Sequence, residues 1–254
     1  PHLLERLAAE QPGQRIQTSV RQALQRQTQA LVNRYAREYS SNHIYNMAAI
    51  VADVETGEVL AYAGNATYPA DERQGNQVDI ITSPRSTGSI LKPFLYAGML
   101  HDGLLLPSML VSDVPLNING FSPHNYNKTF YGAVPAHVAI ERSLNVPLVR
   151  MLSQYNTGRF MSLLKSWGMT TLRFSEEHYG ASLILGGAEG TLWDLSGMYA
   201  SMSRVLKHYR TYNGRYNPAD IHPLTPFPAE RKEPIRSLTD SRLTDKALLS
   251  STAL

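Results

Sequence analysis

Cysteine is absent from this chain, and so is any apolar run long enough to cross a membrane. The first absence excludes disulfides, thiolate catalysis and cysteine-bound zinc, and it is compatible with any compartment. Clustered charge is also missing: lysine and arginine are scattered along a chain of formal net charge +3, so nucleic-acid binding is not indicated. The eight histidines show no spacing typical of ligands, and we expect neither a metal site nor a cofactor.

The composition is that of a globular protein. Of 254 residues, 43% are hydrophobic and 18% are charged, enough for one good-sized core. The chain starts with proline and has no signal-like segment, so we interpret it as a piece of a longer protein. Residues 1–16 are expected to be a linker from an upstream region, and residues 17–254 a single domain.

The hydrophobic pattern predicts a hairpin followed by a block of helices. Two apolar runs, 47–54 and 59–63, flank a turn with glycine at position 57. Residues 107–133 contain several Pro, Gly and Asn residues and are predicted to be irregular. Helical spacing or caps predict helices over 18–40, 89–105, 136–143, 147–154, 159–167 and 191–209, with another beginning at residue 243. In the first helix the spaced apolar residues are Val20, Leu24, Leu31 and Tyr35, and the expected cap is Thr18 or Ser19. This is an α+β arrangement, with further strands expected beyond residue 254.

Ser89 and Lys92 lie three residues apart at a predicted loop-to-helix junction. Residues i and i+3 share one face of a helix, so the Lys92 amine is expected to reach back toward the Ser89 hydroxyl. Such a pair couples a weak nucleophile to a base. The four-residue pattern is weak alone, because Ser-x-x-Lys also occurs by chance on solvated helices.

Ser143 and Asn145 form the second motif, which begins 51 residues after Lys92. A hydroxyl beside a carboxamide suits an acyl-transfer site, where Ser143 relays a proton and Asn145 holds a substrate amide. The alternative is an ordinary helix end, where serine and asparagine are common. Together with Ser89 and Lys92, the catalytic interpretation is favoured.

With these motifs the chain resembles the transpeptidase domain of class A penicillin-binding proteins. Its sequence around the motifs is most similar to that of the penicillin-binding protein 1C subgroup. The resemblance covers residues from about 17 to the end, in the family's order. It is carried by Thr56-Gly57-Glu58-Val59-Leu60-Ala61, Ser86-Thr87-Gly88-Ser89-Ile90-Leu91-Lys92-Pro93, Ser143-Leu144-Asn145-Val146-Pro147 and Leu185-Gly186-Gly187-Ala188-Glu189-Gly190-Thr191. The implied fold is an antiparallel sheet flanked by a helical block.

The resemblance implies a role for each site residue. Ser89 would attack the carbonyl of the penultimate D-alanine of a peptidoglycan stem peptide, and Lys92 would take its proton. The amine would need a pKa lowered by burial and neighbouring positive charge. Ser143 would pass the proton to the leaving amine, and Asn145 would orient the peptide and bond Lys92. β-Lactams would acylate Ser89 as substrate mimics.

One family motif, Lys-Thr-Gly or Lys-Ser-Gly on a strand, does not occur in these 254 residues. In the family this strand follows the helix that starts near residue 191 and its trailing helices. We therefore expect it beyond residue 254, or on a separate complementing segment. The second oxyanion donor and the groups that bind the substrate carboxylate would come with it.

The leading hypothesis is a D,D-transpeptidase that cross-links peptidoglycan outside the cytoplasmic membrane, in the periplasm. The resemblance implies a membrane anchor and a glycosyltransferase domain upstream, in a bifunctional protein. One alternative is a serine β-lactamase or D,D-carboxypeptidase; Glu141 has the spacing of a deacylating glutamate, but it is interpreted as a solvated helix residue. The other is a catalytically incomplete binding or scaffold module of the same fold.

Overall fold

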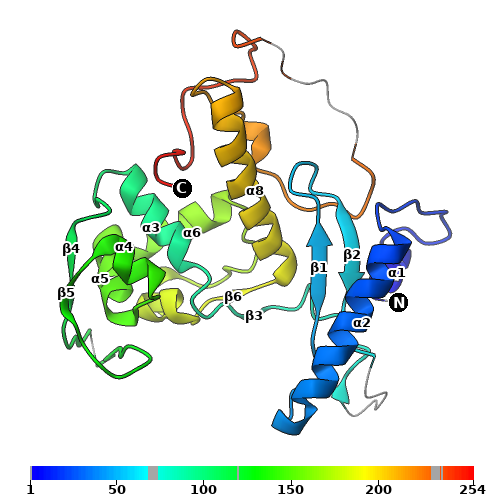
Figure 1. Ribbon diagram of the computed structural model, residues 1–254, viewed down its shortest axis with the longest axis horizontal. Helices are drawn as coiled ribbons and strands as arrows, with labels where there is room; N and C mark the ends of the chain where they lie inside the picture. The colour runs from blue at the N-terminus through cyan, green and yellow to red at the C-terminus, as the bar shows by residue number, and fades with distance from the viewer. Residues whose placement is uncertain (1, 68–73, 119, 230–234, 236) are drawn as a thin grey trace. The chain divides into compact units, whose positions relative to one another are not determined.

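The chain folds into two compact units, each of which mixes helices with short antiparallel strands (Figure 1). The computed structural model describes residues 2–67, 74–118, 120–229, 235 and 237–254. The first unit is made of residues 1–84, 191–207 and 219–243, and the second of 85–190, 208–218 and 244–254. The α+β class expected from the sequence is confirmed.

The predicted hairpin is the centre of the first unit. Strands β1 (Ala49–Ala52) and β2 (Val59–Ala63) pair antiparallel, with Ala49 opposite Ala63 and an irregularity between Val51 and Ala52. The connecting turn contains Gly57 at φ +73°, a left-handed conformation that glycine adopts without steric cost.

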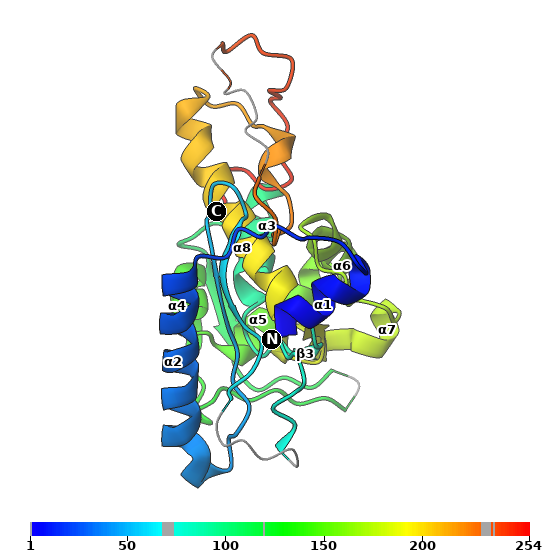
Figure 2. The same ribbon diagram turned by 90° about the vertical axis from the view of Figure 1, so that its right-hand side faces the viewer.

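Helices cover both faces of this hairpin. Successive strand residues point to opposite faces, and Tyr62 packs in a cluster with Ala200 of α8 (Leu192–Thr211), whereas Ala63 packs with Val32 of α2 (Gln22–Tyr39). Figures 1 and 2 show α2 running along the two strands. The hairpin is therefore a buried layer and not a surface ribbon.

Helix α2 differs from its prediction in its start and in its buried face. It begins at Gln22, because the hydroxyl of Ser19 donates to the carbonyls of Val59 and Pro226 and does not cap the helix. Its buried residues are Thr28, Val32 and Ala36, whereas Leu31 and Tyr35 are exposed. Small side chains face the strands because the helix lies close to them, with Ala63 and Ala66 as neighbours.

Residues 1–16 contain a packed helix, α1 (His2–Glu10), within the segment interpreted as a linker. Leu7 is 2% exposed and Leu3 joins the Tyr62 cluster. The ring of His2 bonds the carbonyl of Asn76 at 3.1 Å, and the guanidinium of Arg6 lies 4.5 Å from the ring centre of Trp193. This segment contributes to the core of the first unit.

The second unit contains most of the helical block. Its helices are α3 (Lys92–His101), α4 (Ala136–Glu141), α5 (Asn145–Tyr155), α6 (Thr157–Ser166) and α7 (Glu176–Tyr179), with a 3-10 turn η3 (Gly180–Leu185). Phe94 and Trp167 meet edge to face with ring centres 5.8 Å apart, and both are buried. The cap of α6 is Asn156, whose side chain accepts from the Arg159 N–H. Two further 3-10 turns among the described residues are η1 (Ser40–Asn42) and η4 (Pro218–Asp220).

Two pairs of short strands complete the second unit. Strand β3 (Arg85–Ser86) pairs with β6 (Glu189–Gly190), and β4 (Leu110–Asp113) pairs with β5 (Gly132–Pro135). The prediction that residues 107–133 are irregular throughout is therefore wrong at both ends. The short strands were missed because the residues between them are rich in turn formers.

The helix predicted to begin at residue 243 is also absent: residues 243–254 form an isolated bridge at Thr244, bends and one turn. Thr244 instead exchanges two backbone hydrogen bonds of 2.8 Å with Tyr216, an extended pairing that a helix would prevent. A partner distant in sequence thus outweighs the local helical pattern.

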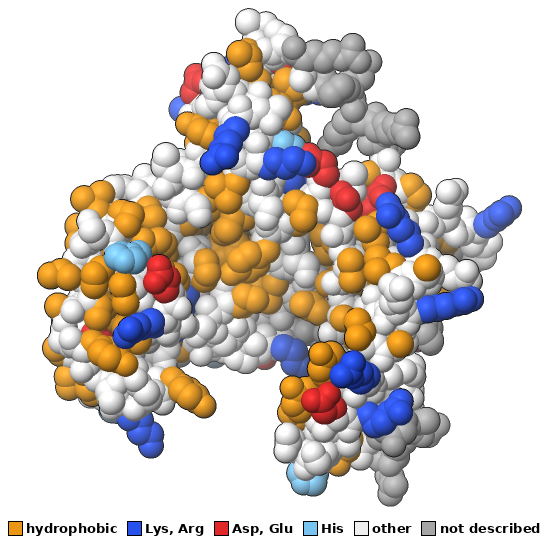
Figure 3. All heavy atoms as spheres, in the orientation of Figure 1, with side chains coloured by type: hydrophobic (Ala, Val, Ile, Leu, Met, Phe, Trp, Pro, Cys, Tyr) orange, Lys and Arg blue, Asp and Glu red, His pale blue; other side chains and the backbone are white. Residues whose placement is uncertain are grey.

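The surface is mixed in character. Within the described residues no helix has the length and apolarity needed to cross a membrane. Apolar side chains are nevertheless exposed on the second unit, and Figure 3 shows hydrophobic groups interspersed with charged ones on the viewed face. The most exposed of these in the segment after α3 are Leu104, Leu106, Met109 and Leu110.

Arg204 of α8 is a buried anchor of the first unit, only 1% exposed. It donates to the carbonyls of Val54, Asp220 and His222 at 2.6 to 3.0 Å, and to the hydroxyl of Ser201. We expect Arg204→Met to lower the free energy of unfolding by about 3 kcal/mol, because it leaves buried acceptors unpaired. Urea unfolding measures this.

The matched control is Lys207→Met, one turn later on the same helix, where an exposed lysine pairs with Glu55. Exposed ion pairs contribute little, so a much smaller change is expected. Equal effects of the two substitutions would contradict the anchoring role of Arg204.

Candidate active site

Ser89 lies in a tight turn that leads from β3 into α3. Residues 88–91 form the turn, and α3 begins at Lys92, whose N–H bonds the Ser89 carbonyl at 3.1 Å. The Ser89 side chain is exposed. The predicted helix thus starts three residues later than expected, and Ser89 precedes it.

The base of this turn is fastened to the segment 186–190. Thr87 donates to the carbonyl of Ala188 through both its N–H, at 3.1 Å, and its hydroxyl, at 3.0 Å. The hydroxyl of Ser86 donates to the carbonyl of Gly186 at 2.8 Å. The β3–β6 pairing continues these contacts, so the turn is held at a fixed position within the unit.

Lys92 is the buried group of the site, with 1% of its surface exposed. Its Nζ donates to the carbonyl of Ser143 at 2.8 Å, to Oγ of Ser143 at 3.1 Å and to Oδ1 of Asn145 at 2.7 Å. An ammonium has three N–H donors, and each has a partner here. The sequence-predicted residues Lys92, Ser143 and Asn145 therefore meet at one point.

Burial lowers the pKa of Lys92 to about 8, because a charged amine loses hydration inside the protein. A lowered pKa is part of the sequence prediction. The neighbouring positive charge that was also expected does not contribute: among the described residues, burial is the cause of the shift. About a tenth of the amine is therefore neutral at pH 7, and this share rises with pH.

Ser143 follows the end of α4 with φ +51°, an unusual value for a residue other than glycine. Its N–H bonds the carbonyl of Ile140 and that of Leu144 bonds Ala139, which closes the helix. Both interpretations of Ser143 are thus compatible: it ends a helix, and it also turns two oxygen atoms toward Lys92. Strained backbone of this kind is often found at functional sites.

Asn145 is the first residue of α5, and its amide is fixed at both ends. Nδ2 donates to the carbonyl of His124 at 2.8 Å, while Oδ1 accepts from Lys92. Its backbone N–H donates to Oδ1 of Asn125 at 2.9 Å. Asn125 in turn donates to the carboxylate of Asp113, at 2.9 and 3.0 Å.

Asp113 and Asn125 are missing from the sequence prediction. Both are buried, at 0% and 3% exposure, and both lie in the stretch predicted to be irregular. The one local sign of these residues is Leu144 at the N-cap of α5. Its side chain is apolar and cannot accept from the first N–H groups of the helix, so an acceptor must come from another segment. The sequence does not show which residue supplies it.

Comparison with known protein families matches residues 47–191 to the penicillin binding protein transpeptidase domain. This chain belongs to that family. All four predicted site residues lie inside the matched range.

Bacterial penicillin-binding proteins are among the relatives of this chain. Penicillin-binding protein 1C of Escherichia coli K12 is 33% identical over 190 residues, which are 75% of this chain and 24% of the relative. Penicillin-binding protein 1B of Vibrio cholerae is 26% identical over 63% of this chain and 20% of the relative. The chain thus spans about a quarter of the length of these relatives.

Solved structures show the same fold. The transpeptidase domain of penicillin-binding protein 3 from Burkholderia pseudomallei has a TM-score of 0.65 at 20% identity, over 95% of this chain and 68% of that one. A peptidoglycan glycosyltransferase from Burkholderia ambifaria has the same score at 19% identity, over 93% and 70%. The penicillin-binding fold expected from the sequence is confirmed.

The hydrogen bond expected between the Ser89 hydroxyl and the Lys92 amine of this transpeptidase domain is not formed in the described residues. The amine bonds Ser143 and Asn145 instead. Glu141 is exposed on α4, and its charge acts on Tyr96, where together with burial it raises the pKa of the phenol.

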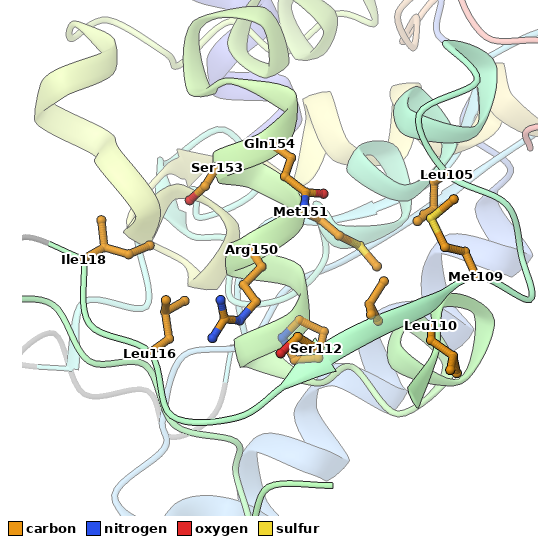
Figure 4. A pocket seen from close by; sticks show the side chains of 12 residues that line it. Leu105, Met109, Leu110, Ser112, Leu116, Ile118, Arg150, Met151, Ser153 and Gln154 are labelled. Atoms are coloured by element: carbon orange, nitrogen blue, oxygen red, sulfur yellow. The ribbon is translucent and has the colours of Figure 1, made fainter. Parts of the chain in front are cut away.

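A cavity of about 590 Å³ lies elsewhere in the second unit of the transpeptidase domain, and none of the four predicted residues lines it (Figure 4). Figure 4 shows Arg150 and Met151 projecting from α5 on one side and Ser112 and Leu110 from β4 on the other. The same two elements carry Asn145 and Asp113 at their ends. The cavity is apolar apart from a few polar side chains, and it is separate from the Lys92 cluster.

Gly186 makes the close approach beneath the Ser89 turn possible. A Cβ atom there would lie 2.8 Å from the N atom and 2.9 Å from the Cα atom of Gly88. Those are backbone atoms, so the turn would have to move. We expect Gly186→Ala to cost about 2 kcal/mol more unfolding free energy than Gly168→Ala.

Gly168 is the matched control, because its φ of +106° resembles the +102° of Gly186 and a Cβ there meets nothing within 4 Å. Both substitutions carry the same backbone strain, and the difference isolates the contact with Gly88. Chemical denaturation of both variants measures the two free energies of unfolding. Equal losses of free energy would show that the Ser89 turn moves aside at no cost.

Proposed function

We propose that this chain carries the Ser89-centred site of a D,D-transpeptidase that forms peptide cross-links in peptidoglycan. The observation that carries the proposal is the Lys92 amine. The amine is buried, its pKa is lowered to about 8, and it bonds Ser143 and Asn145. Lys92 lies three residues after Ser89, which is exposed. The neutral amine is the form of lysine that can take a proton from a serine hydroxyl.

In the proposed first step, Ser89 Oγ forms a bond to the carbonyl carbon of the penultimate D-alanine, and its proton passes to Lys92. The backbone N–H of Ser89 donates to the developing oxyanion. Collapse breaks the peptide bond, and the terminal D-alanine leaves after its nitrogen takes a proton that Ser143 relays from Lys92. The product is an ester between Ser89 and the donor peptide.

In the proposed second step, an amine of another stem peptide attacks the ester carbonyl, the bond from that carbon to Ser89 Oγ breaks, and one amine proton passes through Lys92 to Oγ. The new amide bond is the cross-link, and Ser89 is regenerated. Asn145 orients the donor peptide and keeps its contact with Lys92. The second oxyanion donor is expected on a Lys-Thr-Gly strand, the family motif that does not occur in these 254 residues.

Partners and location follow from this proposal. The substrates are stem peptides that end in D-alanyl-D-alanine, and β-lactams are mimics that acylate the same serine. Peptidoglycan lies outside the cytoplasmic membrane, so the site works in the periplasm or on the outer face of that membrane. A membrane anchor and a glycosyltransferase domain upstream would belong to the same protein.

Transfer of the acyl group to water, as in a β-lactamase or D,D-carboxypeptidase, is the alternative chemistry. It needs a base that activates water near the ester. Glu141 was the candidate from spacing, and its exposed position and its interaction with Tyr96 do not favour that role. Release of the penicilloyl ester within seconds would support a β-lactamase. Hydrolysis of a D-alanyl-D-alanine peptide without a cross-linked product would support a D,D-carboxypeptidase.

Acylation by a fluorescent penicillin tests the nucleophile in the full-length protein. We expect stable labelling of the wild type on a peptide that contains Ser89, and none of Ser89→Ala. Ser153→Ala is the control, since Ser153 is an exposed serine of α5 that bonds its own helix. Labelling of Ser89→Ala at the wild-type rate would overturn the assignment, and absence of wild-type labelling would favour a scaffold.

The pH dependence of acylation tests the base. Because the neutral amine of Lys92 is the active form, the acylation rate should rise about tenfold per pH unit at low pH and level off above its pKa of about 8. Single-turnover rates between about pH 6 and pH 10 measure the profile. Lys92→Arg should abolish acylation, since a guanidinium stays protonated. A flat profile would contradict Lys92 as base.

A further inference from the structure

Helix α5 begins without a cap of its own. The residue at its N-cap, Leu144, has no polar side chain, yet the first turn exposes backbone N–H donors that need acceptors. The third helical residue is Pro147, which has no N–H. Two donors therefore remain at the very start, those of Asn145 and Val146.

Asn125, twenty residues earlier in the chain, supplies the missing acceptor. Its Oδ1 accepts from the N–H of Asn145 at 2.9 Å and from that of Val146 at 3.3 Å. The neighbouring carbonyl of His124 accepts from Nδ2 of Asn145 at 2.8 Å. Two consecutive residues thus hold both the backbone and the side-chain amide of Asn145.

Asp113 decides which way the Asn125 amide points. A carboxylate only accepts hydrogen bonds, so the Nδ2 of Asn125 must face it and Oδ1 must face α5. Nδ2 also donates to the carbonyl of Thr129 at 2.9 Å. Oδ2 of Asp113 also accepts from the N–H of Tyr131 at 3.0 Å, next to the start of the β4–β5 pairing.

We propose that Asp113 and Asn125 are positioning residues of the Ser89 site, which orient Asn145 so that its Oδ1 faces the amine of Lys92. This rests on the proposed transpeptidase function. The chain of contacts runs from Asp113 through Asn125 and Asn145 to Lys92, and every step is 2.7 to 3.0 Å long. Neither positioning residue touches the substrate.

The arrangement has a definite effect on Lys92. Asn145 Oδ1 is one of three acceptors that stabilise the ammonium. If Asn145 moves, the ammonium loses an acceptor, and the pKa of Lys92 falls further. The helices packed against α3 carry His137 and Glu141 on α4, Arg150 on α5, and Arg159 and Lys165 on α6, and β4 carries Asp113; the pKa shift of Lys92 comes from burial and from none of these groups. Misplacement also slows proton transfer from Ser89, because such transfer depends on geometry to a fraction of an ångström.

An exchange of the two residues provides the sharpest test. Asn125→Asp alone sets two buried carboxylates against each other, and acylation of the full-length protein should slow about a hundredfold. Adding Asp113→Asn restores the pair with the roles exchanged: the amide at 113 donates and the carboxylate at 125 accepts. The acylation rate of the double variant should therefore be about tenfold or more above that of Asn125→Asp. Asn127→Asp is the control, because the Asn127 amide lies in the same loop but bonds the exposed hydroxyl of Tyr131.

The readout must separate positioning from folding. Rate constants at saturating penicillin are compared, not amplitudes, because unfolded protein lowers only the amplitude. Asn125→Ala should slow acylation and also move the half-maximal point of the pH profile below the wild-type pH, for the reason given for Lys92. Unchanged rate constants and an unchanged profile in Asn125→Ala, or no recovery in the double variant, would overturn the proposal.

Amide hydrogen exchange tests the geometry without any catalysis. Asn125→Ala should raise exchange at the start of α5, residues 145–146, about tenfold or more, whereas Asn127→Ala should not. Unchanged exchange would refute the cap. If exchange rises but the wild type is never acylated, the proposed function fails while the hold of Asn125 on Asn145 stands.

Discussion

The Lys92 ammonium, buried among the two oxygens of Ser143 and one of Asn145, is the interaction on which the site depends. A buried amine without partners would be expelled or would lose its proton entirely. These contacts compensate part of the lost hydration, and burial still lowers the pKa to about 8. The group therefore exists in both forms near neutrality, which a base requires.

The ammonium needs three acceptors at once, and this requirement restricts the backbone conformation at Ser143 and Asn145. Ser143 takes a left-handed conformation, which allows its carbonyl and hydroxyl to meet one atom. Asn145 must start a helix at a position where the preceding residue is apolar. Each of these local costs is compensated by a contact from a segment that is distant in sequence, such as Asn125.

The sequence was sufficient for whatever depends on local pattern. The hairpin around Gly57 and the helices after Lys92 and Thr191 agree with the structure. The contact of Lys92 with Ser143 and Asn145 was implied by the family resemblance and not by local pattern. The buried face of α2 and the extended end near Thr244 did not follow from it. Both depend on partners far along the chain, Ala63 and Tyr216, which periodicity does not reveal.

The same distinction explains why Asp113 and Asn125 escaped detection. Their residue types are those of a turn, and only the β4–β5 pairing brings the loop back to α5. Ser89 and Lys92 are separated by one turn, whereas their support is spread over residues 113–145 and 186–190. A short motif names the reacting groups, but their geometry comes from segments whose own sequence carries no catalytic signature. The position of Ser89 relative to Lys92 is thus a property of this supporting structure as much as of the motif.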